Sequence, residues 1–300
     1  MPLEGFICPD GGKVLLDDCF EECRIGDRCQ EEPDLHLMSE ERVWGGVPST
    51  TQCLNGTMLE FLKLTRPYYI DPDSRAFMLQ GTMHHKELEL EARELGIPTE
   101  IALNVDRDIF DLLVFNGKVL CLVDRKVWGS FRIAKALGIM VTGKQPDPSG
   151  ETYKSSGKWG KAGSPKMVSK FQQVPDKADN FEATMQLNRY RVLLKEKTGL
   201  NVGGMYLRVL VRDGGLYIAK NRGVYKNTYK IPVGVIPDDE VRAFFDYKRD
   251  CLLEALNNGS WDTPCTPSES WDGIRCRSYC DVSEHCSKGA LVQSIGGEEL

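Results

Sequence analysis

Two groups of four cysteines share one spacing, and this repeat constrains the fold more than any other feature of the chain. The groups are Cys8, Cys19, Cys23 and Cys29, and Cys265, Cys276, Cys280 and Cys286. Every member of the second group follows its counterpart by 257 residues. The residues between the cysteines barely match, so the shared constraint is the spacing of the sulfur atoms.

Four thiolates are the ligand set of a closed tetrahedral zinc site, and they also hold an iron–sulfur cluster. A third alternative is that the cysteines form disulfides or remain buried free thiols. A reducing compartment disfavours the disulfides. We expect two structural zinc ions because each group is complete in itself, with a 4Fe–4S cluster as the alternative. Cys121 lies in an apolar stretch and is expected in the core.

Composition excludes few classes of function. The 300 residues are 41% hydrophobic, which suffices for a sizeable core. The chain has no apolar stretch of about 18 residues and no basic segment followed by an apolar run at its start, so we expect no membrane contact and no secretion. The expected location is the cytoplasm of a bacterium, with a bacterial or phage gene. The net charge of −6 does not exclude nucleic acid, because local charge governs binding.

Hydrophobic periodicity and turn residues predict a mixed α/β fold. Apolar residues at helical spacing, with capping residues at the ends, predict four helices, at residues 48–65, 82–96, 180–198 and 237–257. Residues 129–138 predict a further helix, and residues 205–213 and 223–233 predict strands. Residues 141–178 are rich in Gly, Ser, Pro and Lys and predict a flexible basic loop.

Two apolar runs on either side of Asn116-Gly117 predict a β-hairpin. A two-residue turn pairs Phe115 with Lys118, which places Asp111 opposite Leu122. Residues two apart on a strand share a face, so Asp111, Asp124 and Lys126 are expected on one face. The two aspartates are then diagonal neighbours, about 7–8 Å apart at Cα.

Paired carboxylates beside a lysine suit phosphodiester hydrolysis. Two carboxylates, waters and a substrate phosphate form a normal Mg²⁺ or Mn²⁺ site. The cation lowers the pKa of bound water, and the Lys126 ammonium adds charge where the transition state needs it. The apolar runs on both strands also predict burial, where unpaired charges are costly.

Asp111 followed by Asp124-Arg125-Lys126 resembles the motifs of the PD-(D/E)XK nucleases. Gly81-Thr82-Met83-His84-His85 resembles the Gly-x-x-x-His motif of their RecB-like branch, and Gln186-Leu187-Asn188-Arg189-Tyr190 resembles its Gln-x-x-x-Tyr motif. The resemblance covers about residues 81–190 and implies a restriction-endonuclease-like core of mixed sheet and flanking helices. It implies metal ligation by His85, Asp111 and Asp124, activation by Lys126, and positioning by Gln186 and Tyr190. Glu89 matches an acidic position often found in the family.

The terminal cysteines resemble the same branch in part. Some members, including AddB and the CRISPR-adaptation nucleases, hold an iron–sulfur cluster between one upstream cysteine and three C-terminal ones. Cys276, Cys280 and Cys286 resemble that trio, but Thr65 stands where the upstream cysteine is expected. We therefore predict a metal module at residues 1–40, a nuclease core at 41–258 and a second metal module at 259–300.

The predicted function is hydrolysis of DNA, exonucleolytic on single strands or ends, without sequence specificity. Basic side chains are expected to track phosphates, and Trp159 and Phe171 could stack on bases. The predicted DNA contacts are Arg125, Lys154, Lys158, Lys161, Lys166 and Lys170. The alternatives are a non-catalytic nucleic-acid-binding module with the nuclease fold and a structural adaptor built on the two metal modules.

Overall fold

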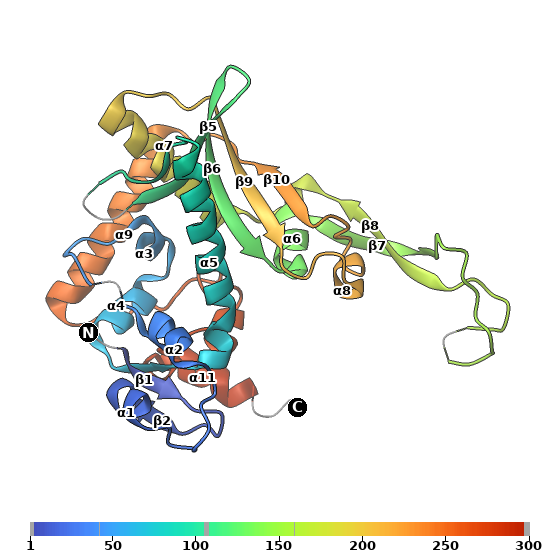
Figure 1. The fold of residues 1–300 in the computed structure, drawn as a ribbon, viewed down its shortest axis with the longest axis horizontal. Coiled ribbons are helices and arrows are strands. Elements are labelled where there is room, and N and C mark those ends of the chain that lie inside the picture. Colours follow the sequence, from blue (N-terminus) through green and yellow to red (C-terminus); the bar gives the residue numbers. More distant parts are fainter. Residues whose placement is uncertain (1–2, 42, 105–107, 159, 297–300) are drawn as a thin grey trace. The chain divides into compact units, whose positions relative to one another are not determined.

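The computed structural model describes residues 3–41, 43–104, 108–158 and 160–296. These residues form a mixed α/β protein with eleven α-helices and ten strands in three sheets (Figure 1). The predicted α/β class is confirmed at this level. The chain divides into two compact units, residues 1–113, 185–202 and 235–300 in the first and residues 114–184 and 203–234 in the second. The predicted boundaries after residues 40 and 258 stay a prediction.

The first unit contains a three-stranded sheet in the order β2-β1-β3. Strand β1 (Leu3–Ile7) pairs antiparallel with β2 (Lys13–Leu15) and parallel with β3 (Tyr68–Ile70). Helices α1 (Leu16–Glu21) and α2 (Glu32–Ser39) follow the first hairpin. The parallel pairing draws the N-terminal segment onto a strand that is some sixty residues later in the chain.

One apolar core of the first unit joins the N-terminal and C-terminal segments. Its fully buried members include Phe6, Leu35, Ile70, Leu252 and Val282. Helix α9 (Asp238–Asn258) contributes Leu252, and Val282 lies between α10 (Ile274–Ser278) and α11 (Ser287–Gly296). Five cysteines of the repeat pack against this core, namely Cys8, Cys19, Cys265, Cys280 and Cys286. The two cysteine groups therefore share one core.

The single helix predicted at residues 48–65 is wrong, because two helices occupy the segment. Helix α3 (Thr50–Leu54) begins at Ser49, whose side chain and Gln52 form a capping box, and α4 (Thr57–Thr65) follows. Asn55 is extended between them, and its side chain donates to Glu60 and accepts from Arg275. A Cβ at Gly56 would lie 2.3 Å from Cys265 Sγ. Contacts with a distant segment thus break the helix.

The helix predicted at residues 82–96 is longer at its start. Helix α5 (Pro72–Glu94) begins ten residues earlier, where Asp71 caps its first turn and Pro72 stands at the first helical position. Gly96 ends it with a φ of +67°, as expected. Strand β4 (Thr99–Ala102), which was not predicted, follows at once.

A five-stranded mixed sheet has the order β10-β9-β6-β5-β4. The predicted hairpin is confirmed, because β5 (Ile109–Asn116) and β6 (Val119–Trp128) flank Asn116-Gly117. Strand β6 runs parallel to β9 (Gly204–Val211), and β10 (Thr228–Pro232) is antiparallel to β9. Helix α6 (Ser130–Leu137) also matches its prediction, whereas residues 217–220 form a short helix, α8 (Tyr217–Lys220). Leu122, Leu207 and Val209, all in the second unit, are fully buried.

The loop predicted at residues 141–178 is wrong towards its two ends, which form strands, whereas the described residues among 147–166 contain no named helix or strand. Strands β7 (Ile139–Pro146) and β8 (Met167–Gln173) pair antiparallel from Ile139↔Gln173 to Pro146↔Met167, and Figure 1 shows them as a two-stranded ribbon. The pairing shifts its register between Val141 and Gly143, a β-bulge that lets the ribbon twist. The lysines and glycines of this segment are compatible with an exposed two-stranded ribbon, because few side chains of such a ribbon are buried.

Helix α7 (Phe181–Thr198) and helix α9 follow their predictions closely. No helix in the described part of the chain is both long enough and apolar enough to cross a membrane. In the first unit, α7 and the start of α9 are joined by Asp238, whose Oδ1 lies 2.6 Å from Arg191 and whose Oδ2 lies 2.9 Å from Lys195. Hydrogen bonds from Lys195 and Arg191 lower the pKa of Asp238 to about 2.

Replacing Asp238 by asparagine should lower the free energy of unfolding by about 1 kcal/mol at neutral pH, once solvent screening is allowed for. The folded-state pKa is below the ordinary value of 3.8, so this stabilisation is present above pH 3.8 and is lost as the pH falls towards 2. Denaturant titrations of wild type and Asp238→Asn across that range measure the difference. Asp239→Asn, one residue along and exposed, is the matched control. Equal losses for both variants would contradict the prediction.

Candidate functional site

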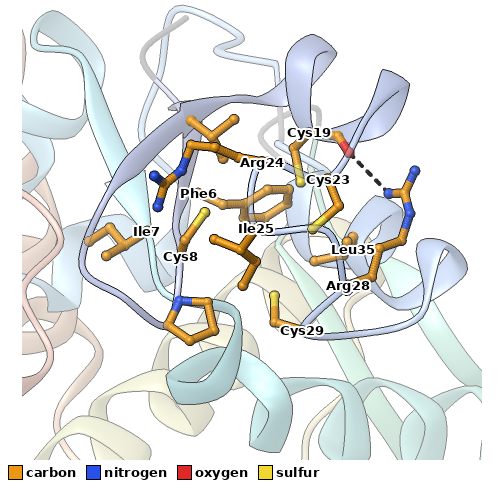
Figure 2. A pocket seen from close by; sticks show the side chains of 12 residues that line it. Phe6, Ile7, Cys8, Cys19, Cys23, Arg24, Ile25, Arg28, Cys29 and Leu35 are labelled. Atoms are coloured by element: carbon orange, nitrogen blue, oxygen red, sulfur yellow. Dashed lines mark hydrogen bonds between the residues drawn. The ribbon is translucent and has the colours of Figure 1, made fainter.

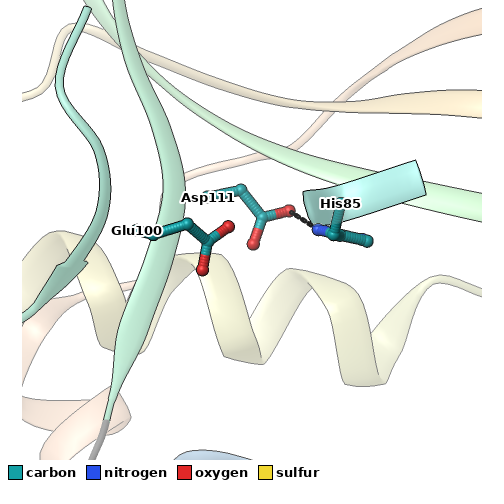
Figure 3. Close-up of side chains that lie close together, drawn as sticks. All are labelled: His85, Glu100 and Asp111. Atoms are coloured by element: carbon teal, nitrogen blue, oxygen red, sulfur yellow. Dashed lines mark ion pairs between the residues drawn. The ribbon is translucent and has the colours of Figure 1, made fainter. Parts of the chain in front are cut away.

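Three side chains from separate elements converge in the first unit. His85 lies on α5, Glu100 on β4 and Asp111 on β5, and one ligand atom of each lies within 4.8 Å of the others. His85 Nδ1 is 3.6 Å from Asp111 Oδ2. Figure 3 shows the Glu100 carboxylate directed towards Asp111 from the side away from His85. The structure thus brings together the predicted pair of His85 and Asp111 and adds Glu100.

The register of β4 and β5 explains the position of Glu100. Thr99 pairs with Leu112 and Ile101 with Phe110, so Glu100 lies across from Asp111. Residues directly opposite on neighbouring strands present their side chains to the same face. The Thr99 hydroxyl donates to the Asp111 carbonyl oxygen at 2.6 Å, which ties the two strands at this point.

Glu100 also has an unusual backbone, with a φ of +47°. A residue with a side chain disfavours this left-handed region by about 1–2 kcal/mol, and such strain concentrates at functional sites. The sequence analysis missed Glu100. The available signal was an acidic residue in a short β-prone segment, TEIA, directly before the hairpin strand.

This cluster has the donors of a divalent-cation site. It offers two carboxylates and one imidazole, and Mn²⁺ accepts both oxygen and nitrogen ligands, whereas Mg²⁺ prefers oxygen. The side chains of His85 and Asp111 are 32% and 13% exposed, so the site is shielded but open to a ligand from solvent. Two carboxylates this close repel each other unless a cation or a proton lies between them.

Asp124 and Lys126 form a second arrangement, in the other unit. They lie on β6, two residues apart and therefore on one face, as expected. Lys126 Nζ lies 2.9 Å from Asp124 Oδ2 and 3.1 Å from Oδ1. Asp124 is 1% exposed, so this carboxylate depends on its partners for charge compensation. The parallel neighbour β9 presents Leu207 and Val209 at the same positions of the ladder.

Gln186 and Tyr190 are in contact, as their spacing predicts. They lie one turn apart on α7, and Gln186 Nε2 donates to the Tyr190 hydroxyl at 3.0 Å. Tyr190 is 5% exposed, so its ring is held by packing. Glu89, the acidic position on α5, forms an ion pair with Arg93 four residues along.

The first cysteine group surrounds a small cavity. Cys8, Cys19, Cys23 and Cys29 line about 20 Å³ together with Phe6, Ile25 and Leu35 (Figure 2). Cys8 lies at the end of β1, where its N–H donates to Gly12, and Cys19 lies on α1. Burial raises the pKa of the Cys19 and Cys29 thiols. Four thiols converging on one apolar pocket suit a bound metal better than separate surface roles.

The second cysteine group is partly buried beside the shared core. Cys265, Cys276, Cys280 and Cys286 are all half-exposed, and burial raises the pKa of Cys265 and raises that of Cys280 to about 11. Lys288 donates to the Cys265 carbonyl oxygen at 2.7 Å, which joins α11 to the first cysteine of the group. The three isolated cysteines, Cys53, Cys121 and Cys251, are buried, as expected for Cys121.

The sulfur positions bear on which metal fits. Among the described residues, three ligand atoms lie within 4.8 Å of one another in the His85 cluster, and in neither cysteine group do three sulfurs approach that closely. A zinc ion with Zn–S bonds of about 2.3 Å requires sulfurs about 3.8 Å apart. The described sulfurs of each group are therefore not arranged as in a closed zinc tetrahedron.

The predicted DNA contacts are placed on the second unit. Lys154, Lys158 and Lys161 are exposed in the segment between β7 and β8, and Lys170 is exposed on β8. Lys166 forms an ion pair with Glu151 at 2.5 Å, and Arg125 is half-buried on β6 between Asp124 and Lys126. Phe171 is half-buried on β8, and Trp159 lies outside the described residues.

Comparisons with known proteins add little to this geometry. No protein-family model matches the chain, and the search of curated proteins found no match. Among solved structures, one titled "Crystal structure of SSO0001" is similar at 11% sequence identity and a TM-score of 0.39, over 85% of this chain and 93% of that one. A TM-score below 0.5 does not establish a common fold.

Proposed function

We propose that this protein is a divalent-metal-dependent nuclease that hydrolyses phosphodiester bonds in DNA. The observation that carries the proposal is the convergence of His85, Glu100 and Asp111 within 4.8 Å. Phosphodiesters resist hydroxide because both are negative, and a bound divalent cation removes that repulsion and supplies a nucleophilic water. The three side chains come from three elements, which favours a built site over an accidental surface cluster.

In the proposed site, His85, Glu100 and Asp111 hold Mg²⁺ or Mn²⁺, and Asp124 contributes a further carboxylate. The spacing of Asp111 and Asp124-Arg125-Lys126 along the chain, which resembles the metal motif of the PD-(D/E)XK nucleases, supports this combination. The Lys126 ammonium, 2.9 Å from Asp124, supplies the positive charge that stabilises the phosphate as negative charge grows on its oxygens. Gln186 and Tyr190, fixed by their mutual hydrogen bond, orient the strand or the lysine.

The order of these groups along the chain supports a place among the PD-(D/E)XK nucleases. The motif residues follow one another along the chain in the family's order: the histidine is on α5, the first aspartate on β5, the Asp-x-Lys pair on β6 and the Gln-x-x-x-Tyr pair on α7. We therefore propose a restriction-endonuclease-like core of the RecB-like branch. We propose DNA as the substrate because the lysines of the β7–β8 ribbon can follow a phosphate backbone.

We further propose that both cysteine groups bind metal, as two zinc ions or as iron–sulfur clusters, and hold the ends of the chain on the shared core. The apolar cavity enclosed by the first group supports this proposal. Absorbance in the visible range distinguishes the two metals, because iron–sulfur clusters are coloured and zinc is not.

Wild-type protein is expected to shorten end-labelled single-stranded DNA in the presence of Mn²⁺ and to lose this activity when EDTA removes the cation. The reason is that the water nucleophile depends on the cation. Denaturing electrophoresis of the products measures both the rate and the polarity of cleavage. Single nucleotides released from one end indicate an exonuclease. No Mn²⁺-dependent cleavage of single-stranded DNA, duplex DNA or RNA would contradict the proposal and favour a binding module.

A further inference from the structure

A cleft of about 480 Å³ opens in the first unit beside the second cysteine group. Its walls come from the first hairpin, from α4 and the start of α5, and from residues 275–284, so both ends of the chain contribute. We call it the basic cleft, because five cationic side chains line it: Lys13, Lys63, Arg75, Arg275 and Arg277. Its volume is within the range of about 300–1,000 Å³ that is typical of small-ligand sites.

The charge of the basic cleft is opposite to that of the whole chain. Five cations face three carboxylates, those of Asp71, Asp281 and Glu284, whereas the chain has a net charge of −6. An excess of two positive charges in a concave wall concentrates the field and attracts anions.

Three of the cations already have carboxylate partners. Lys63 lies 2.8 Å from Asp281, which also pairs with Arg75, and Lys13 lies 2.9 Å from Glu284. These pairs brace the walls, since Lys13 belongs to the first hairpin and Glu284 to the second cysteine segment. They account for two of the three acids and involve neither Arg275 nor Arg277.

Arg275 and Arg277 are the cations of the basic cleft that form no ion pair among the described residues. The Arg275 guanidinium donates to neutral oxygens, to Asn55 Oδ1 at 2.7 Å and to the Glu269 carbonyl at 3.3 Å. Those contacts hold the group in place without neutralising its charge. Arg277 is exposed two residues along on α10. A planar guanidinium recognises phosphate through two parallel N–H bonds.

Aromatic rings lie beside these arginines. Tyr279 is 62% exposed, and its ring centroid is 5.8 Å from that of Trp271. Arg275 lies 5.0 Å from the centroid of the Trp271 ring, so the indole supports both the arginine and the tyrosine. Tyr69 also lines the basic cleft, with Lys13 over its ring at 4.8 Å. An exposed ring held next to a phosphate-binding group is the arrangement that stacks on a nucleic-acid base.

We propose that the basic cleft binds a nucleotide of single-stranded DNA, with its phosphate on Arg277 and Arg275 and its base on Tyr279. The cleft would hold the strand at a point separate from the His85 cluster. This inference rests on the proposed nuclease function for its choice of ligand. The adjoining cysteine group then keeps the wall of a strand-binding site in place, because Cys276 and Cys280 lie in the same wall as the arginines.

Fluorescence anisotropy with a labelled oligothymidylate, in EDTA to prevent cleavage, tests the proposal. Arg277→Glu should weaken binding about tenfold or more, and Tyr279→Ala about fivefold or more, as removal of a stacking ring does. Arg277→Ala should reduce the slope of log affinity against log salt concentration by about 0.7, the value for one phosphate of a single strand. Arg242→Glu, at a half-buried position of α9 that pairs with Glu196 and lies outside the cleft, is the control charge reversal and should bind like wild type apart from a small general effect.

Thermal unfolding of the variants at Arg277 and Tyr279 should match wild type, because both side chains are exposed. Equal affinities for Arg277→Glu, Tyr279→Ala and Arg242→Glu would overturn the proposal. Thymidine monophosphate distinguishes the source of the ligand, because full competition by it at low concentration would mean a free-nucleotide site and would overturn strand binding. If the wild-type protein cleaves DNA and the cleft variants bind DNA normally, only the proposal that the cleft binds DNA is refuted. Weakened binding without cleavage by wild type would refute the nuclease function alone.

Discussion

Both Asp124→Ala and Asp124→Asn are expected to reduce the rate of Mn²⁺-dependent DNA cleavage by about 10²–10³-fold. The carboxylate is almost fully buried beside Lys126, and in the proposed site it binds the cation that the reaction requires. The asparagine variant keeps the volume and removes the charge, so it separates a loss of chemistry from a cavity. Single-turnover cleavage of end-labelled single-stranded DNA gives the rate.

Glu100→Gln applies the same test to Glu100, which the structure places beside His85 and Asp111. Loss of one ligand should weaken the apparent affinity for Mn²⁺ about 10–100-fold, with part of the cleavage rate recovered at high Mn²⁺ concentration. Asp124→Asn should not be recovered in this way. Glu87→Gln, an exposed acid on the same helix as His85, is the control and should leave both quantities unchanged.

Stability must be measured beside activity, because removing the Asp124 carboxylate leaves Lys126 without that partner. Variants that remain folded and lose cleavage support the assignment. Cleavage by Asp124→Asn at the wild-type rate would refute the role of this aspartate. An unchanged Mn²⁺ dependence in Glu100→Gln would remove Glu100 from the ligand set and leave His85 and Asp111.

The second large effect is expected at the cysteine groups. Cys280→Ser should halve the amount of bound structural metal and lower the midpoint of thermal unfolding by about 10 °C or more, because structural metal binding stabilises small modules by about 10–16 kcal/mol. The effect should spread beyond the module, since Cys280 packs against the core that joins both ends of the chain. Elemental analysis and calorimetry measure the two quantities.

Cys19→Ser is the equivalent change in the first group and should also halve the metal content, and the double variant should remove it. Cys251→Ala removes a buried cysteine outside the repeat and should cost about 1 kcal/mol without loss of metal. Wild-type protein without bound zinc or iron, or a Cys280→Ser variant with full metal content, would refute the metal modules.

Local sequence rules predicted the elements whose partners are close along the chain. The Asn116-Gly117 turn and the Gly96 and Gly199 helix ends follow from the conformational needs of one or a few residues. The contact between Gln186 and Tyr190 follows in the same way, because residues four apart on a helix are neighbours.

Two of the missed features depend on contacts between segments that are separated along the chain. The helix predicted at residues 48–65 breaks where Asn55 bonds Arg275 and Gly56 approaches Cys265, more than 200 residues away. The β7–β8 ribbon depends on cross-strand pairing over a polar segment, so its burial pattern resembles that of a loop. A hydrophobic pattern cannot reveal strands that bury few side chains.

The sequence by itself determined the chemical groups: a histidine, two aspartates and a lysine in a defined order, and eight cysteines in a repeated spacing. Covalent spacing settles which side chains share one hairpin or one helical turn. The tertiary structure decided that Glu100 joins His85 and Asp111, and that the two ends of the chain share a core and a basic cleft. Those placements follow from strand register and from burial of apolar side chains, which are properties of pairs of segments and not of either segment alone.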